Sequence, residues 1–184
     1  LLLIAGAGSG KTKTLVYRVV NLVNKGVQPE NILLLTFTRK SSQEMLTRAT
    51  RLLDSRCEKV SGGTFHSFSN LMLRKYANRI GFNPQFTILD QGDAEDLIQL
   101  IRKQLGFGKA EKRFPKKNTI LSILSKSINT GKSIAVLLQN DYPQFVEFKT
   151  DIEKIEHEYK NRKYHSQVMD YDDLLVRFVQ ILEE

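Results

Sequence analysis

Apolar runs alternate with stretches of helical period in the first part of the chain. Residues 1–5 and 32–37 are short apolar runs typical of buried strands, and apolar side chains at helical spacing follow each run. The first helical stretch ends at Gly26, and the second is expected from Ser41, which forms a capping-box spacing with Glu44. This order of strand, loop, helix, strand and helix predicts a parallel sheet with crossover helices, in which ligands bind at the carboxyl ends of the strands.

The rest of the pattern is mainly helical. A third short strand is expected near residues 59–61, followed by a helix that stops at Gly81. Asp90 can cap a further helix that Gly106 closes, and from there to about position 163 we expect helices and loops without a strand. One apolar seam with steps of three and four residues predicts a single long helix. Its members are Phe145, Phe148, Ile152, Ile155 and Tyr159.

The composition is that of a globular protein. The chain has 184 residues, of which 41% are hydrophobic and 26% are charged. That is enough for one domain of roughly 100–200 residues that carries an insertion. Cys57 is the only cysteine, which excludes a disulfide scaffold and a cysteine-based zinc site and favours a reducing, cytoplasmic setting. The apolar runs are far shorter than the roughly 20 residues of a membrane helix, so we expect a soluble protein with no membrane partner.

The two ends of the sequence indicate a piece of a longer protein. Leu1 stands where a complete chain has Met, and it opens an apolar run with no charged segment or cleavage-site pattern, which argues against a signal peptide. Residues 181–184 stop inside an amphipathic pattern. We therefore expect further chain on both sides.

Positive charge is concentrated in the middle of the chain. The formal net charge is +8, divided into +5 over residues 1–97, +7 over residues 98–146 and −4 over residues 147–184. The middle segment can attract a polyanion, although solvated helix faces explain the same charge equally well. Its basic residues are Arg102, Lys103, Lys109, Lys112, Arg113, Lys116, Lys117, Lys126 and Lys132, and its acidic residues are Glu111 and Asp141.

A glycine-rich loop joins the first expected strand to the first expected helix. Residues 5–12 read AGAGSGKT, and this context is the one that a Walker A loop requires. Glycines let backbone N–H groups turn towards phosphate oxygens, and the helix N-terminus adds positive charge there. In such a loop Lys11 reaches the β- and γ-phosphates, and the Thr12 hydroxyl ligates Mg²⁺. The candidate phosphate-binding residues are Ala5, Gly6, Ala7, Gly8, Ser9, Gly10, Lys11 and Thr12.

ATP is the expected nucleotide, because guanine specificity usually shows as Asn-Lys-x-Asp and no such tetrad occurs. Hydrolysis also requires a second carboxylate on Mg²⁺. The acidic cluster that could supply it is Asp170, Asp172 and Asp173. Only Val168 and Met169 precede this cluster as apolar residues, and a helical pattern follows it. The cluster is therefore better explained as a helix start, where carboxylates interact favourably with the helix dipole.

Four ordered segments together resemble the UvrD/Rep family of superfamily 1 DNA helicases. Residues 5–12 resemble motif I of that family, and residues 34–45, reading LLTFTRKSSQEM, are similar to its motif Ia. Residues 64–68, reading TFHSF, resemble motif Ib. Residues 170–175, reading DYDDLL, resemble the short motif where the chain returns from a helical insertion to the first RecA-like domain. Four matches in order are far more specific than a Walker A loop alone.

The resemblance implies a role for each matching residue. Lys11 and Thr12 serve ATP and Mg²⁺, and Lys13 stands where family members often have an arginine that stacks on adenine. Phe37 stacks on a base and the neighbouring side chains contact phosphates of single-stranded DNA. Without the family, Phe37 is simply the end of a strand and His66 a structural histidine. The implied DNA-binding residues are Thr36, Phe37, Thr38, Arg39, Lys40, Thr64 and His66.

The resemblance also implies an organisation. Residues 1–89 are the first part of a RecA-like nucleotide-binding domain with a partial parallel sheet, residues 90–165 are a helical basic insertion, and residues 166–184 return to the first domain. The implied protein is an ATP-dependent helicase that unwinds duplex DNA 3′ to 5′, in repair or in replication restart. The family's glutamine motif, Asp-Glu Walker B motif, arginine finger and second motor domain have no match in this sequence. We therefore expect the isolated chain to bind nucleotide weakly and not to hydrolyse it appreciably.

Two alternatives remain open at this stage. A P-loop kinase or NTPase with a helical lid would use the basic insertion on a small phosphorylated substrate, but it gives TFTRK and TFHSF no role. A nucleic-acid-binding module with a vestigial P-loop would bind DNA without catalysis. Loss of DNA affinity in Phe37→Ala together with strong salt dependence favours the helicase.

Overall fold

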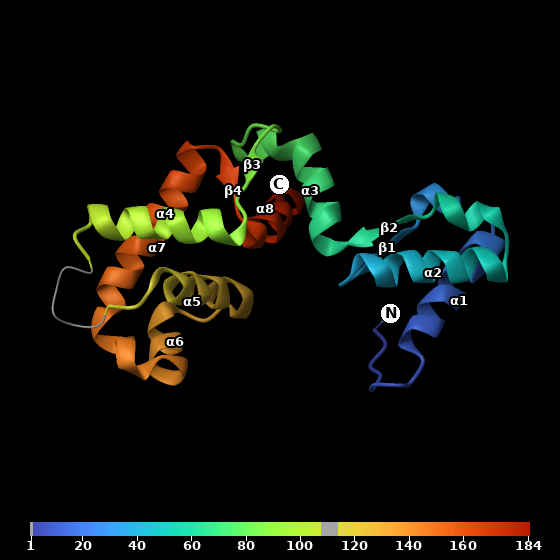
Figure 1. Ribbon diagram of the computed structural model, residues 1–184. Coiled ribbons are helices and arrows are strands. Elements are labelled where there is room, and N and C mark those ends of the chain that lie inside the picture. Colours follow the sequence, from blue (N-terminus) through green and yellow to red (C-terminus); the bar gives the residue numbers. More distant parts are fainter. Residues whose placement is uncertain (1, 108–113) are drawn as a thin grey trace. The chain divides into compact units, whose positions relative to one another are not determined.

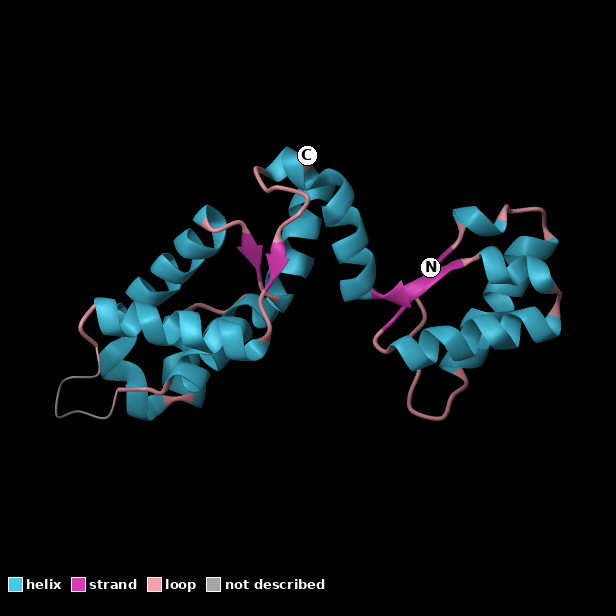
Figure 2. Cartoon of the chain, turned by 45° about the horizontal axis from the view of Figure 1, so that its top comes forward, coloured by secondary structure: helices cyan, strands magenta, loops and turns pink. Residues whose placement is uncertain are grey.

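The computed structural model describes residues 2–107 and 114–184. It divides the chain into two compact units, Leu1–Ser69 and Asn70–Glu184. Helices predominate, and each unit holds one parallel sheet of two short strands (Figures 1 and 2). The expected α/β class is therefore confirmed in its coarse form, as a mostly helical fold with small parallel sheets.

Part of the expected basic segment lies outside the described residues. The side chains concerned are Lys109, Glu111, Lys112 and Arg113. Across the two described ranges, none of the helices combines the length and the apolar character needed to cross a membrane.

The first unit is built around two parallel strands. β1 (Leu33–Thr36) pairs with β2 (Ser61–Thr64) in register along the whole length of both. The chain order around them is α1 (Lys11–Asn24), the 3₁₀ helix η1 (Pro29–Asn31), β1, α2 (Arg39–Leu52), the 3₁₀ helix η2 (Ser55–Lys59) and β2. The apolar side chains of these elements form one buried core, made of Val16, Val19, Val23, Ile32, Leu34, Met45, Ala49, Cys57 and Val60.

Two strand predictions need correction. Residues 2–5 form no strand, and Leu2, Leu3 and Ile4 are exposed. Among the described residues, the sheet of this unit consists of β1 and β2, so residues 2–5 have no strand partner in it. The strand expected near residues 59–61 begins instead at Ser61, because the preceding residues form η2.

The start of α2 also differs from the expected one. Thr38 is the N-cap, and its side-chain oxygen accepts a hydrogen bond from the Ser41 amide at 3.1 Å. Glu44 forms an ion pair with Arg48 on the same helix. The capping box expected at Ser41 and Glu44 is therefore wrong, because the helix begins at Arg39 as soon as β1 has ended.

The second unit holds the helical insertion and the segments that lead into and out of it. α3 (Phe65–Tyr76) carries the chain from the first unit into the second. The elements that follow are the 3₁₀ helix η3 (Ala77–Ile80), β3 (Thr87–Ile88), α4 (Gln91–Gln104), α5 (Lys117–Thr130), α6 (Ile134–Asp141), the 3₁₀ helix η4 (Pro143–Phe148), α7 (Lys149–His165), β4 (Val168–Met169) and α8 (Tyr171–Glu183).

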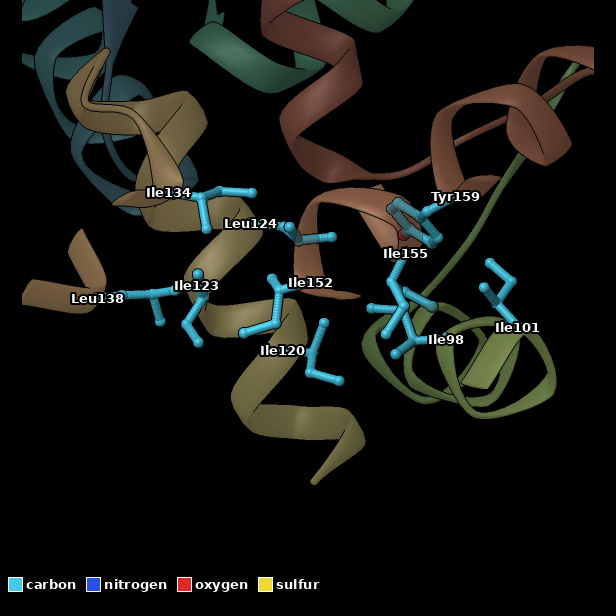
Figure 3. Close-up of a cluster of buried hydrophobic side chains, with 11 residues drawn as sticks. Ile98, Ile101, Ile120, Ile123, Leu124, Ile134, Leu138, Ile152, Ile155 and Tyr159 are labelled. Carbon is cyan, nitrogen blue, oxygen red and sulfur yellow. The ribbon is translucent and has the colours of Figure 1, made fainter. Parts of the chain in front are cut away.

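Four helices of the insertion share one core (Figure 3). Its fully or nearly fully buried members come from α4, α5, α6 and α7. They are Ala94, Ile98, Ile101, Ile120, Ile123, Leu124, Ile134, Leu138, Ile152, Ile155 and Tyr159. The long helix expected from Phe145 begins only at Lys149, and Phe145 and Phe148 pack on the same core from η4. The apolar seam was correct, but it crosses from a 3₁₀ helix into an α-helix.

A second core of this unit lies around the paired strands β3 and β4. These strands lead the chain into and out of the insertion, and they run parallel. Asp90 caps α4, and Gly81 and Gly106 have positive φ at the helix ends, as expected from the sequence. The buried residues of this core are Leu73, Ala77, Ile80, Phe82, Phe86, Met169, Leu174 and Ile181.

Candidate nucleotide loop and nucleic-acid edge

The glycine-rich loop has a backbone that only glycine adopts without strain. Gly8 has φ +75° and Gly10 has φ +85°, both in the left-handed region. A Cβ atom built on Gly6, Gly8 or Gly10 would meet no heavy atom within 4 Å, so the space beside the loop is open. The glycines therefore set the shape of the loop and leave room for a ligand against its backbone.

Lys11 lies across this loop at the start of α1. Its ammonium donates to the carbonyl oxygens of Ala5 at 3.0 Å and Gly6 at 2.8 Å. The Ser9 hydroxyl donates to the same Gly6 oxygen at 2.7 Å. The ammonium is exposed and held by two neutral acceptors, so an anionic phosphate is the stronger partner for it.

Two further residues of the first turn of α1 fit a nucleotide site. The Thr12 side chain is half-buried and carries the hydroxyl expected to ligate Mg²⁺. Magnesium keeps several waters and takes few protein ligands when phosphates supply the rest, so a single hydroxyl fits an ion that arrives with its nucleotide. The Lys13 ammonium lies 5.8 Å from the centre of the Tyr17 ring. Within the described ranges, no cluster of three or more His, Cys, Asp or Glu side chains could hold a metal ion.

The expected DNA-binding residues gather at the carboxyl edge of the β1–β2 sheet. Thr36 and Thr64 end the two strands and are paired in register. The Thr36 hydroxyl donates to the Thr38 carbonyl at 2.8 Å, and the Thr64 hydroxyl lies 2.8 Å from the Ser67 hydroxyl. These internal bonds show that the threonines shape the turns that leave the sheet as well as lying beside its edge.

Two phenylalanines stand beside each other at this edge. Phe37 is 94% exposed and Phe65 is 44% exposed, and their ring centres lie 5.8 Å apart at an angle of 49°. Phe65 was not among the residues expected from the sequence. The signal that could have found it is positional, because each ring follows the last threonine of one of two parallel strands in register.

Positive charge borders this aromatic pair. Arg39 and Lys40 open α2 and are both exposed, and His66 is exposed in the first turn of α3. In the described part of this unit, neither Arg39 nor Lys40 takes part in an ion pair. The edge therefore combines exposed rings with the cations of Arg39 and Lys40, for which the described residues provide no carboxylate partner.

The acidic cluster is a helix start, as the sequence favoured. Asp170 is the N-cap of α8 and forms a reciprocal capping box with Asp173. The Lys163 ammonium lies 2.6 Å from a carboxylate oxygen of each. Although burial opposes it, the charge of Lys163 holds the pKa of Asp170 below its usual value, whereas burial raises the pKa of Asp173. These carboxylates are already bound within the fold and do not form a metal site.

Comparison with known proteins agrees with this geometry. The UvrD/REP helicase N-terminal domain model matches residues 1–184. The chain belongs to the UvrD/REP helicase family. The ATP-dependent DNA helicases PcrA of Staphylococcus epidermidis strain ATCC 35984 and Staphylococcus aureus strain Mu50 are 32% and 31% identical to it over 186 residues. Each alignment covers 100% of this chain and 24% of the relative, so the chain spans about a quarter of their length.

The family expected from four short motifs is thus confirmed over the whole chain. In this UvrD/REP family member the glycine-rich loop directly precedes α1 without the strand expected before it, and residues 36–38 and 64–66 lie at one sheet edge. The chain is similar to PcrA in the insertion too, where the sequence carried no motif.

Proposed function

We propose that the chain forms the N-terminal motor segment of an ATP-dependent DNA helicase that unwinds 3′ to 5′. One observation carries the proposal: Thr36 and Thr64 bring two motif segments to one edge, where the Phe37 and Phe65 rings are exposed beside exposed arginine and lysine side chains. This edge belongs to the same unit as the glycine-rich loop. Family membership supports the RecA-like identity of the sheet. The domain division at residues 1–89, 90–165 and 166–184 is part of the same proposal.

ATP binds at the loop in this proposal. Backbone N–H groups of residues 6–10 face the phosphates, Lys11 exchanges its two carbonyl acceptors for phosphate oxygens, and Thr12 orients a nucleotide-borne Mg²⁺. Mg²⁺ supplies charge neutralisation at the phosphates when bound. Lys13 lies beside Tyr17 and adds positive charge at the rim. The open space beside Gly8 and Gly10 is what a phosphate chain requires.

Single-stranded DNA binds at the carboxyl edge of the β1–β2 sheet. Exposed aromatic rings give sequence-tolerant stacking, and Arg39 and Lys40 give contacts to phosphates. Thr36, Thr38, Thr64 and His66 line the turns beside the strand. The helical insertion binds duplex DNA in this proposal, and its basic residues form the contact surface. Two of these residues, Lys117 and Lys126, are already paired with acidic side chains.

The deciding experiment measures affinity for single-stranded DNA at two salt concentrations. Variants Phe37→Ala and Lys11→Ala are compared with the wild type by fluorescence anisotropy. We expect steep salt dependence and a loss of affinity of about 5- to 150-fold in Phe37→Ala, which is the value of one stacked base. Lys11→Ala keeps its DNA affinity because Lys11 serves the nucleotide.

The matched control is Leu52→Ala. Leu52 is an exposed apolar residue at the opposite end of α2, so its truncation removes similar surface away from the edge. Absence of DNA binding by the wild type, in this chain and in the protein that carries it, defeats the helicase proposal. Binding of small phosphorylated compounds in place of DNA would then favour the P-loop kinase alternative.

A further inference from the structure

The acidic turn, residues 170–173, has more partners than a helix cap needs. Asp170 accepts from the Asp173 amide at 2.9 Å, and Asp173 accepts from the Asp170 amide at 3.1 Å. This reciprocal box alone satisfies the start of α8. Both carboxylates nevertheless make further bonds to α7, and Asp172 makes one to α5, so the turn joins the return helix to two helices of the insertion.

Lys163 is the link to α7. It is 4% exposed, and its ammonium lies 2.6 Å from Asp170 and 2.6 Å from Asp173. Tyr159, one turn earlier on α7, donates its hydroxyl to Asp170 at 2.9 Å, and its ring lies 4.4 Å from the Lys163 ammonium. A buried cation between two carboxylates has one favourable geometry, because any displacement leaves buried charge without a partner.

Asn129 is the link to α5. Its side-chain amide donates to Asp172 at 2.9 Å, and it also donates to the Ser125 carbonyl at 2.9 Å within its own helix. The last turn of α5 is therefore tied to the first turn of α8. The two links approach the acidic turn from different helices that share the core shown in Figure 3.

The backbone completes the same connection. β3 and β4 pair immediately before Asp90 and Asp170, and the Leu89 amide donates to the Met169 carbonyl at 2.8 Å. The chain thus enters the insertion at α4 and leaves it at α8, and the starts of these two helices follow paired strands. Each helix has an aspartate as its N-cap.

We propose that the acidic turn is a rigid joint that makes the helical insertion and the return helix α8 move as one body, with Lys163 as its positioning residue. The consequence of this joint rests on the proposed function. When DNA displaces the insertion to which it is bound, the insertion moves α8 by the same amount. The DYDDLL segment then has a mechanical role in place of a metal-binding one.

The first test uses the protein that carries this chain and measures ATP consumed per base pair unwound. Lys163→Met keeps the apolar stem and removes the charge, and we expect the ratio to rise about 2- to 30-fold, the range over which coupling residues act. A general folding defect lowers ATP hydrolysis and unwinding together and leaves the ratio unchanged. Lys160→Met is the matched control, since Lys160 lies one turn earlier on α7 in an exposed pair with Glu156. An unchanged ratio in Lys163→Met overturns the proposal.

A second variant guards against misfolding. Lys163→Met/Asp170→Asn/Asp173→Asn removes all three charges while Asn retains the capping oxygen. We expect this triple variant to regain the thermal stability that Lys163→Met loses. The ATP consumed per base pair unwound should stay raised, because the ion pairs between the acidic turn and α7 are still missing. Recovery of both stability and ratio would show that Lys163 only balances charge, and the joint would be refuted.

The last test does not depend on helicase activity. Hydrogen exchange of this chain is compared between the wild type, Asn129→Ala and Asp172→Ala. We expect both variants to speed exchange several-fold in the last turn of α5 and the first turn of α8, and not in α1 or α2. If DNA binding fails in the wild type, the proposed function falls while this measurement still decides the joint; unchanged exchange in both variants overturns it.

Discussion

In the proposed DNA site, Phe65 adds a second exposed ring beside Phe37. The two ring centres are 5.8 Å apart and tilted by 49°, so in the proposed complex bases would stack on the outer faces of the rings. We predict that Phe65→Ala weakens single-stranded DNA binding by about 5- to 150-fold, comparable with Phe37→Ala. Because the chain has no tryptophan, Phe37→Trp supplies a single reporter whose fluorescence DNA should quench. If Phe65→Ala binds single-stranded DNA as tightly as the wild type, Phe65 does not stack on a base and the prediction is contradicted.

Lys11 is expected to serve ligand binding and not folding. Its ammonium is exposed, and among the described residues its hydrogen bonds go to the loop carbonyls of Ala5 and Gly6. Lys11→Ala should therefore weaken ATP binding by about 10- to 150-fold, the value of hydrogen bonds to a charged group. Titration calorimetry with ATP and Mg²⁺ measures this, and thermal unfolding should show an unchanged midpoint. Lys25→Ala, at the C-terminal end of the same helix, is the control; equal losses in both would point to net charge alone.

The caps of α2 can be distinguished by their effect on stability. Thr38 caps the helix in the structure, so Thr38→Ala should lower the free energy of unfolding by about 0.5–2 kcal/mol. Glu44→Ala removes only an exposed pair with Arg48 and should cost about 0.5 kcal/mol or less. Urea unfolding of both variants measures the difference. A larger loss in Glu44→Ala would restore the capping box expected from the sequence.

The acidic turn predicts opposite pH effects for its two buried aspartates. Lys163 holds the pKa of Asp170 below its usual value against the effect of burial, so Asp170 contributes stability that is lost as the pH falls below about 4. Burial raises the pKa of Asp173, so the folded state takes up that proton first and gains stability as the pH falls towards 4. The check is the urea unfolding midpoint, measured from neutral to acidic pH. The fall in the midpoint below about pH 4 should be smaller in Asp170→Asn than in the wild type, and the rise in the midpoint as the pH approaches 4 should be absent in Asp173→Asn. Parallel profiles in both variants would contradict this assignment.

The sequence predicted those elements whose signals are local. Asp90 and Gly106 bound α4 as expected, and β1 lies inside the apolar run at residues 32–37. Residues 2–5 were wrongly predicted to form a buried strand. A strand needs a neighbouring strand for its backbone hydrogen bonds, and hydrophobic periodicity does not reveal whether one is present. The start of α2 was misplaced because Thr38 and Ser41 are both good caps, and only the end of β1 decides between them.

The candidate sites show the same limit. The glycine-rich loop is a local motif, so the sequence alone names its residues, and their binding of nucleotide stays a prediction. Phe65 acquires its place from the register of β1 with β2, and the contacts of Lys163 depend on the turn through β4 that brings the end of α7 to the start of α8. The register of β1 with β2 joins residues distant along the chain, and the Lys163 contacts require the turn through β4, so periodicity reveals neither relation.

At the scale of the whole molecule, the described residues include no group of three or more His, Cys, Asp or Glu side chains that could hold a metal ion for hydrolysis. Asp170 and Asp173 are held by Lys163, and Asp172 by Asn129. We therefore predict that the purified 184-residue chain releases phosphate from ATP no faster than its Lys11→Ala variant, with or without single-stranded DNA. Binding of ATP by the same preparation shows that the loop is intact. Steady turnover that Lys11→Ala abolishes would mean that the chain supplies its own carboxylate, and the acidic turn would then be the first place to seek it.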